Sequence, residues 1–259
     1  MKIERLDSVE STNKYCEALN LTEVEDFTCY WALKQTAGIG QRGNHWHSAP
    51  GENLTFSLVL KPTWLPAERQ FKLTQAISLA TTDFLATYHL PHTTHIKWPN
   101  DIYVGNRKIC GTLTTARLSN QAFKQSNTQA IKQSSNQAII STAICGIGLN
   151  VNETLFPDWV PNPTSLRLLT GKSHDLGEAL RALLQCIEHR YMALRDGANI
   201  EAEYLGLLLG RGEAKRYTHL GQPVTATITG VDEYGRLLLT AENGSQLCCN
   251  MKELSYSWL

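Results

Sequence analysis

The chain has 259 residues, enough for one large domain or for one large and one small domain. Its 24 basic side chains equal its 24 acidic ones, whereas proteins that bind DNA or RNA usually carry a basic excess, so no nucleic-acid partner is expected. No apolar run reaches membrane-spanning length, and the first residues lack the apolar core of a signal peptide. These features predict a cytoplasmic protein with no membrane partner.

The first half of the chain is predicted to mix short strands and helices. Strands are expected within residues 1–11, at 27–34 and at 54–60, where apolar and polar residues alternate; helices are expected from Ser11 or Thr12 to Leu19 or Leu21, and over 71–88. Residues 35–53 form a glycine-rich loop. Residues 118–137 are polar and of low complexity, which predicts a poorly ordered connection between two strands.

In the second half, β character returns at residues 138–151, and helices are expected from 164–165, over 176–195 and over 200–209. The pattern changes at Gly210-Arg211-Gly212, after which only short strands and turns follow. We therefore predict a large α/β domain at 1–210 and a small SH3-like β-barrel at 213–259.

The central motif occupies residues 95–111. Gly105-Asn106 lies between two β-rich runs and predicts a two-residue type II′ hairpin turn. The expected cross-strand pairs are Val104–Arg107, Tyr103–Lys108, Asp101–Cys110 and Asn100–Gly111. This register places Asp101 and Lys108 on one face, and strand alternation places Lys97 opposite Ile96 and Trp98. A surface hairpin with solvated charges is the alternative.

Three further motifs carry polar or backbone groups suited to a ligand. The glycines of Thr36-Ala37-Gly38-Ile39-Gly40-Gln41-Arg42-Gly43 would let backbone N–H groups converge on an anion, although many such loops are ordinary turns. The loop is not a Walker A sequence. Ser11-Thr12-Asn13 suits a helix cap, and Gly146-Ile147-Gly148-Leu149-Asn150-Val151-Asn152 suits a strand end.

All seven cysteines are predicted to be reduced, because their number is odd and their spacing fits no metal site. Most are expected in the core. Cys110 lies in the central motif, but no histidine is evidently paired with it, so a nucleophilic role stays an alternative.

The motifs together resemble those of biotin protein ligases. Lys97-Trp98-Pro99-Asn100-Asp101 followed by Lys108-Ile109-Cys110-Gly111 is similar to the family's central signature. Gln35-Thr36-Ala37-Gly38 through Trp46-x-Ser48-x-Pro50-Gly51-x-Asn53 resembles its ligand-binding loop. Ser11-Thr12-Asn13 and the 146–152 motif also have counterparts in the family, and all four motifs occur in the family's order.

The resemblance implies an α/β (α+β) fold of the class II aminoacyl-tRNA-synthetase-like, biotin/lipoate ligase type, with a small C-terminal SH3-like barrel. It implies an ATP-dependent ligase that converts biotin into biotinyl-5′-AMP and transfers the biotinyl group to a lysine of a biotin carboxyl carrier protein of a carboxylase. ATP and biotin are then the substrates, Mg²⁺ accompanies the phosphates, and the chain is a monomer or a homodimer. Lys2 opens the first strand and Ser11 follows, so the short form without an N-terminal DNA-binding domain is expected.

The same resemblance implies site residues. Catalytic charge is assigned to Lys97, which would bridge the biotin carboxylate and the α-phosphate, and to Arg42. Biotin contacts are assigned to Ser11, Thr12, Asn13, Gln35, Gly38, Ile39, Gly40, Gln41, Lys97 and Gly111. Nucleotide contacts are assigned to Arg42, Trp46, Asn100, Lys108, Asn150 and Asn152. Asp101 is the candidate metal residue.

The loop departs from the family pattern at Ile39 and Gln41, where arginine is frequent, so Arg42 is its one cation. Three alternatives remain: a lipoate or octanoate ligase or transferase of the same superfamily, a biotin-sensing regulator that binds DNA, and an inactive scaffold. The presence of both Lys97 and Lys108 argues against the last.

Overall fold

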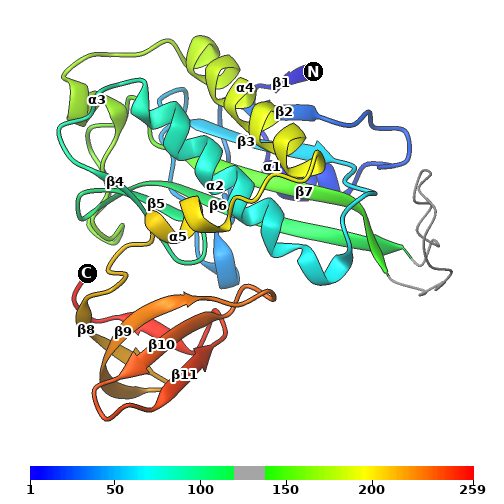
Figure 1. The fold of residues 1–259 in the computed structure, drawn as a ribbon. Coiled ribbons are helices and arrows are strands. Elements are labelled where there is room, and N and C mark those ends of the chain that lie inside the picture. The colour runs from blue at the N-terminus through cyan, green and yellow to red at the C-terminus, as the bar shows by residue number, and fades with distance from the viewer. Residues whose placement is uncertain (120–137) are drawn as a thin grey trace, which may run out of the picture.

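The computed structural model describes residues 1–119 and 138–259. Most of the predicted polar connection at 118–137 therefore lies outside the described residues. Figure 1 shows the elements, which are β1 (Lys2–Leu6), α1 (Thr12–Glu17), β2 (Thr28–Ala32), β3 (Leu54–Leu60), α2 (Phe71–Ala86), β4 (Thr94–Lys97), β5 (Asp101–Val104), β6 (Arg107–Ser119), β7 (Ile139–Leu149), α3 (Leu166–Thr170), α4 (Leu176–Arg195), α5 (Glu201–Gly206), β8 (Ala214–His219), β9 (Gln222–Val231), β10 (Leu237–Ala241), β11 (Gln246–Cys249) and β12 (Leu254–Tyr256), with 3₁₀ turns at Gln41–Gly43 and Ala67–Arg69.

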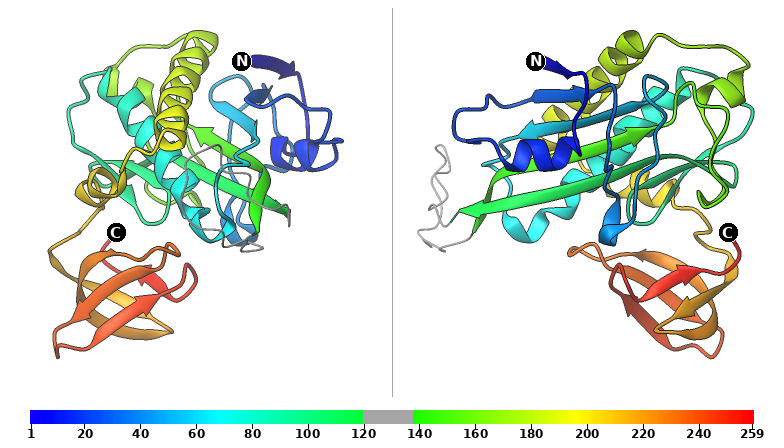
Figure 2. Two further views of the ribbon diagram at one scale, coloured as in Figure 1. Left: turned by 45° about the vertical axis from the view of Figure 1, so that its right-hand side comes forward. Right: turned by 180° about the vertical axis from the view of Figure 1, so that it is seen from behind.

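Within the described residues, seven strands form one mixed sheet in the order β1-β2-β3-β7-β6-β5-β4. Helices α2 and α4 cover one face and α1 lies on the other (Figures 1 and 2). Side-chain alternation explains this: the paired Leu58 and Cys145 join the large core, whereas the paired Val59 and Ile144 pack with Cys16 of α1. The predicted apolar–polar alternation of β3 does not give it a solvent-exposed face, because all seven of its residues are buried.

Helix α4 has the bounds predicted from the sequence, residues 176–195, and its cap and buried face explain why. Asp175 caps it, with its carboxylate accepting a hydrogen bond from the Glu178 N–H at 2.7 Å. Its buried positions recur every three or four residues, at Leu180, Leu183, Leu184, Ile187, Tyr191 and Leu194. Among the helices of the described ranges, none is long and apolar enough to span a membrane.

The central hairpin forms between β5 and β6, and its turn is Gly105-Asn106 as predicted. The inner pairs Val104–Arg107 and Tyr103–Lys108 are confirmed. The outer two pairs are wrong, because the register shifts between Ile102 and Tyr103, so that Cys110 pairs with Ile102 instead of Asp101. The extra residue on β6 is a β-bulge, which turn length and alternation do not reveal.

The C-terminal strands form an antiparallel sheet in the order β11-β10-β9-β8-β12, consistent with an SH3-like domain. Figure 2 shows it beneath the first sheet, with the C-terminus at the junction. The two sheets share one cluster of buried apolar side chains, and Trp98 Nε1 donates to the Gly235 carbonyl at 3.0 Å. Strands β8 to β12 all lie in the region after residue 212 where only short strands and turns were expected. The division into domains at 210–213 stays a prediction.

Candidate functional site

A cavity of about 370 Å³ lies among the four motifs, a volume typical of small-molecule sites. It brings together most of the predicted site residues: Ser11, Thr12, Asn13, Gln35, Ile39, Gly40, Gln41, Trp46, Lys97, Asp101, Lys108 and Gly111. These residues come from segments up to 100 positions apart, and the sheet order β3-β7-β6-β5-β4 is what gathers them.

The floor of the cavity is bare of side chains. Gly111 of β6 and Gly148 of β7 pair across the sheet, and Gly146 lies two residues before Gly148 on the same face. A Cβ on Gly148 would collide with the Trp46 indole, and one on Gly111 would lie 3.0 Å from Trp46 Cζ3. Gly148 therefore leaves the space that the Trp46 indole occupies, and Gly111 relieves a tight contact with the same ring.

Hydroxyl and amide groups gather at one end of the cavity. Helix α1 begins at Thr12 as predicted, but it ends early, at Glu17, and the Ser11 side chain makes no capping hydrogen bond. Instead, the Thr12 N–H donates to Gln35 Oε1 at 2.8 Å, and the Ser57 hydroxyl lies 2.6 Å from Asn13 Oδ1. Ser11 thus occupies the expected N-cap position of α1 without a side-chain capping bond, and Ser11-Thr12-Asn13 also lines the cavity.

Two lysines of the central motif border the cavity. Lys108 Nζ lies 2.7 Å from Asp101 Oδ2, which confirms that these side chains share a face. The same ammonium lies 5.5 Å from the ring centre of Trp46. Lys97 Nζ lies 5.1 Å from the ring of Tyr256, a residue of the C-terminal sheet. The two cations therefore meet one cavity from β4 and β6, the strands on either side of β5.

The glycine-rich loop folds back over the cavity. The Trp46 N–H donates to the Gly38 carbonyl at 2.9 Å, so Gly38 serves as backbone and its side-chain space is filled by Trp46. Gln41 Nε2 donates to Asn100 Oδ1 at 3.0 Å, and Asn100 Nδ2 donates to the Thr112 carbonyl at 2.7 Å. Asn100 is thereby engaged within the protein. The side chain of Arg42 lies outside the described part of the structure.

A second cavity lies beside the first, between loop residues 43–47 and residues 156–163, and Trp46 and Lys108 border both. Asn150 also borders it, with Nδ2 donating to the Thr164 carbonyl at 2.9 Å. Asn152 is not brought to either cavity: its amide exchanges hydrogen bonds with the backbone of His174, at 2.8 and 2.9 Å. Its predicted nucleotide contact stays a prediction.

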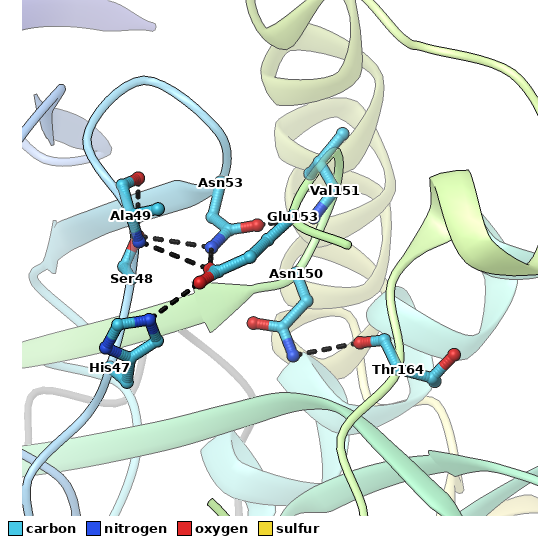
Figure 3. Close-up of polar contacts among 8 residues, drawn as sticks. All are labelled: His47, Ser48, Ala49, Asn53, Asn150, Val151, Glu153 and Thr164. Carbon is cyan, nitrogen blue, oxygen red and sulfur yellow. Dashed lines mark hydrogen bonds and ion pairs between the residues drawn. The ribbon is translucent and has the colours of Figure 1, made fainter. Parts of the chain in front are cut away.

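A buried polar cluster supports the loop from behind (Figure 3). The Glu153 carboxylate, with 3% of its side chain exposed, lies 2.6 Å from His47 Nε2. It also accepts hydrogen bonds from the Ala49 N–H at 3.2 Å and from Asn53 Nδ2, while Asn53 Oδ1 accepts from the Val151 N–H at 2.9 Å. The cluster ties the segment after Trp46 to the segment that follows β7.

Comparison with known proteins shows what this chain is similar to. A family model described as the biotin/lipoate A/B protein ligase family matches residues 6–127. The bifunctional ligase/repressor BirA of Bacillus spizizenii is 29% identical over 243 residues, which cover 92% of this chain and 69% of that protein. The biotin–[acetyl-CoA-carboxylase] ligase of Mycobacterium tuberculosis is 28% identical over 213 residues, 80% of this chain and 71% of that protein.

The structural likeness covers almost the whole chain. The biotin protein ligase from Aquifex aeolicus, solved in complex with biotin and ATP, matches with a TM-score of 0.75 at 25% identity, over 98% of this chain and 97% of that one. The chain is thus similar to biotin protein ligases over almost its whole length. This likeness confirms the predicted mixed α/β fold with a small C-terminal β-sheet.

The described residues offer no group of three metal-binding side chains. Asp101 borders the cavity, but its carboxylate is already paired with Lys108. Mg²⁺ prefers one or two carboxylates together with phosphate oxygens and water. The protein side chains alone therefore do not make a magnesium site, and any metal role of Asp101 depends on the phosphates of a nucleotide.

A nucleophilic cysteine does not fit the first cavity. Cys110 is fully buried, and burial raises the pKa of its thiol well above the ordinary value, so the thiolate is scarce at neutral pH. In the described residues, which include all seven cysteines, none forms a disulfide, as predicted. Five of the seven are buried, namely Cys16, Cys29, Cys110, Cys145 and Cys249.

Some of the residues in and around the first cavity were not predicted from the sequence. Met251, Leu254 and Tyr256 line the cavity from the C-terminal sheet. Lone residues of this kind carry no local signal, because only the packing of the two sheets brings them there. His47 and Glu153 are 106 positions apart, and neither belongs to a recognisable pattern.

Proposed function

We propose that this chain is an ATP-dependent biotin protein ligase. It joins biotin to ATP as biotinyl-5′-AMP with release of pyrophosphate, and then transfers the biotinyl group to a lysine of a biotin carboxyl carrier domain with release of AMP. The observation that carries the proposal is the meeting of Lys97 and Lys108 at one cavity whose far end is lined by Ser11-Thr12-Asn13 and Gln35. The curated relatives named as ligases support it.

The first step brings two anions together. The biotin carboxylate attacks the α-phosphate, so negative charge builds up where the two meet and must be met by fixed positive groups. Lys97 is assigned to that point. Lys108 is assigned to the phosphate oxygens, for which it would leave or share its contact with Asp101. Arg42 is assigned to the same phosphates from the loop.

The two substrates have separate places in this proposal. Biotin, apolar with a few polar points, occupies the cavity end where hydroxyls and amides are buried. The nucleotide lies toward the second cavity, where Trp46 offers a flat apolar face and Asn150 a buried amide. Loop 35–53 would then lie over the mixed anhydride and keep water from it.

The second step needs a partner. The neutral amine of an acceptor lysine attacks the acyl carbon of biotinyl-5′-AMP, an amide bond forms, and AMP leaves with the bonding electron pair of the broken anhydride. The acceptor is a carrier domain of a carboxylase, and ATP enters as its Mg²⁺ complex. A cytoplasmic location and a monomeric or homodimeric state belong to the same proposal.

The deciding experiment incubates the protein with ATP, Mg²⁺, biotin and a biotin carboxyl carrier domain, and measures the intact mass of the carrier. A mass increase of one biotinyl group is expected, and none when the acceptor lysine is replaced by arginine. Parallel reactions with lipoate or octanoate test the related ligase activity. An acylated carrier with lipoate but not with biotin would overturn the proposal. An electrophoretic shift with operator DNA tests the regulator alternative.

A further inference from the structure

The C-terminal sheet takes part in the wall of the first cavity. Its last strand, β12, is antiparallel to β8, and Tyr256 pairs there with Tyr217. Tyr256 and Leu254 line the cavity together with Lys97 of the first sheet. Neither the four sequence motifs nor the proposed reaction assigns a role to this strand.

The aromatic ring of Tyr256 faces the ammonium group of Lys97. The distance from Nζ to the ring centre is 5.1 Å, and a second ring, that of Tyr103, lies at 5.7 Å. Both distances are within the range in which the negative face of an aromatic ring attracts a cation. Burial raises the pKa of Tyr256 far above its ordinary value, so the side chain is neutral and acts through its ring face.

The ring itself is fixed in place. Its centre lies 5.3 Å from that of Tyr217 in an edge-to-face contact and 5.8 Å from that of Trp258. Such aromatic contacts restrict ring orientation. Tyr256 therefore presents a fixed ring to the Lys97 ammonium.

The backbone around Lys97 is also held. The Ile96 N–H donates to the Leu207 carbonyl at 2.8 Å, and the Trp98 indole donates to the Gly235 carbonyl at 3.0 Å. The four-carbon stem of a lysine allows its ammonium, a compact point charge, to take many positions. A ring on one side of that ammonium limits those positions.

We propose that Tyr256 is a positioning residue for Lys97. Its ring directs the ammonium toward the place where the biotin carboxylate meets the α-phosphate, so that the C-terminal sheet contributes to the adenylation step. This inference rests on the proposed ligase function. It concerns the first half-reaction, because the charge that Lys97 offsets develops there.

The test compares Tyr256→Leu, which removes the ring, with Tyr256→Phe, which keeps it. Biotin-dependent pyrophosphate release should fall about 10- to 30-fold in kcat for the leucine variant and stay within about threefold for the phenylalanine variant, with KM for biotin changing little. Tyr234→Leu is the matched control: Arg236 lies over that ring at 5.5 Å, but the pair is on the exposed surface of the same sheet. This control should behave as the unchanged protein.

A double-mutant cycle separates positioning from structural support. In the Lys97→Ala background, Tyr256→Leu should lower kcat by less than about twofold further, because a residue that acts through Lys97 loses its effect when Lys97 is gone. An equal further loss would overturn the inference, as would a Tyr256→Phe variant as weak as Tyr256→Leu. Melting by circular dichroism shows whether each variant is folded.

A readout independent of turnover keeps this inference distinct from the proposed function. The Hε resonances of Lys97 should show a ring-current shift in the unchanged protein, and Tyr256→Leu should remove the part due to Tyr256 while leaving the part due to Tyr103. A shift that is the same in Tyr256→Leu as in the unchanged protein contradicts the positioning role, whatever the activity. If the shift changes in Tyr256→Leu but the unchanged protein releases no pyrophosphate with biotin, the ligase assignment is contradicted, and the role in adenylation with it.

Discussion

The cluster around Glu153 and the two cavities around Trp46 both place polar groups in the protein interior, but they satisfy them differently. In the cluster, the carboxylate is met by His47, the Ala49 N–H and Asn53, all within the protein. At the cavities, the buried Trp46 Nε1 and Asn150 Oδ1 have no hydrogen-bond partner among the residues described. Buried polar atoms are almost always paired in folded proteins. The satisfied cluster is therefore part of the scaffold, whereas Trp46 Nε1 and Asn150 Oδ1 remain available for hydrogen bonds at the cavities.

The largest expected effect comes from the cavity side. Lys97→Ala should lower biotin-dependent pyrophosphate release about 10²- to 10³-fold, the loss typical when one fixed group that stabilises transition-state charge is removed. The free energy of unfolding should hardly change, because the side chain lies at the cavity and outside the apolar core. Stopped-flow detection of pyrophosphate measures the rate, with the exposed Lys14→Ala as control. Full release by Lys97→Ala would remove this lysine from the site.

The opposite pattern is expected for the cluster. Glu153→Ala should lower the free energy of unfolding by about 3 kcal/mol, since it leaves the Asn53 amide and the Ala49 N–H buried without an acceptor. Urea denaturation followed by circular dichroism measures this. Glu153→Gln keeps one acceptor oxygen and should lose less. Glu10→Ala, which removes a surface ion pair, should be nearly neutral. Unchanged stability of Glu153→Ala would mean that the cluster is not structural.

A smaller effect is expected where a cation is added to the cavity. Ile39 borders the cavity, at a position where the ligand-binding loop of biotin protein ligases often has arginine. Ile39→Arg should slow dissociation of biotinyl-5′-AMP about tenfold, since one charge-assisted hydrogen bond is worth about 1.5–3 kcal/mol. Rapid dilution of the preformed complex gives the rate. Faster dissociation would show instead that Ile39 packs against the biotin rings.

The smallest effect is expected outside both regions. Replacing residues 120–137 by a short turn should leave adenylation within about threefold, because loop length contributes little to stability when the ends already meet. Ser119 pairs with Ile139, so β6 and β7 are adjacent where the replacement begins and ends. Initial rates of pyrophosphate release and the soluble yield are the measurements. A collapse of either would show that this segment packs against the site or a partner.

Sequence patterns predicted the local elements of this chain well. The turn Gly105-Asn106, the helix over 176–195 and the shared face of Asp101 and Lys108 follow from periodicity and turn chemistry alone. The outer register of the hairpin did not follow, because a bulge in β6 inserts one residue without altering composition or alternation.

The site was predicted where it depends on motifs and missed where it depends on packing. Ser11-Thr12-Asn13 was singled out, but a cap and a cavity wall need the same residue types, and only the contacts with Gln35 and Ser57 distinguish them. Tyr256 and Glu153 reach their partners across 159 and 106 positions, as the numbering of Lys97 and His47 shows. A local stretch of sequence does not reveal contacts between residues that lie so far apart in the chain.

The hydrogen bond between Trp98 and Gly235, formed across 137 positions, has a consequence for how the protein is made. A nascent chain that has emerged as far as α5 already carries both lysines, the glycine floor and the loop. It still lacks the wall that Tyr256 supplies, and the turn that anchors Trp98 has not yet been synthesised. Domains fold as units while synthesis proceeds from the N-terminus. The cavity is therefore completed only after β12 has been synthesised, and a chain that stops after α5 holds the two lysines without the strand that lines the cavity beside them.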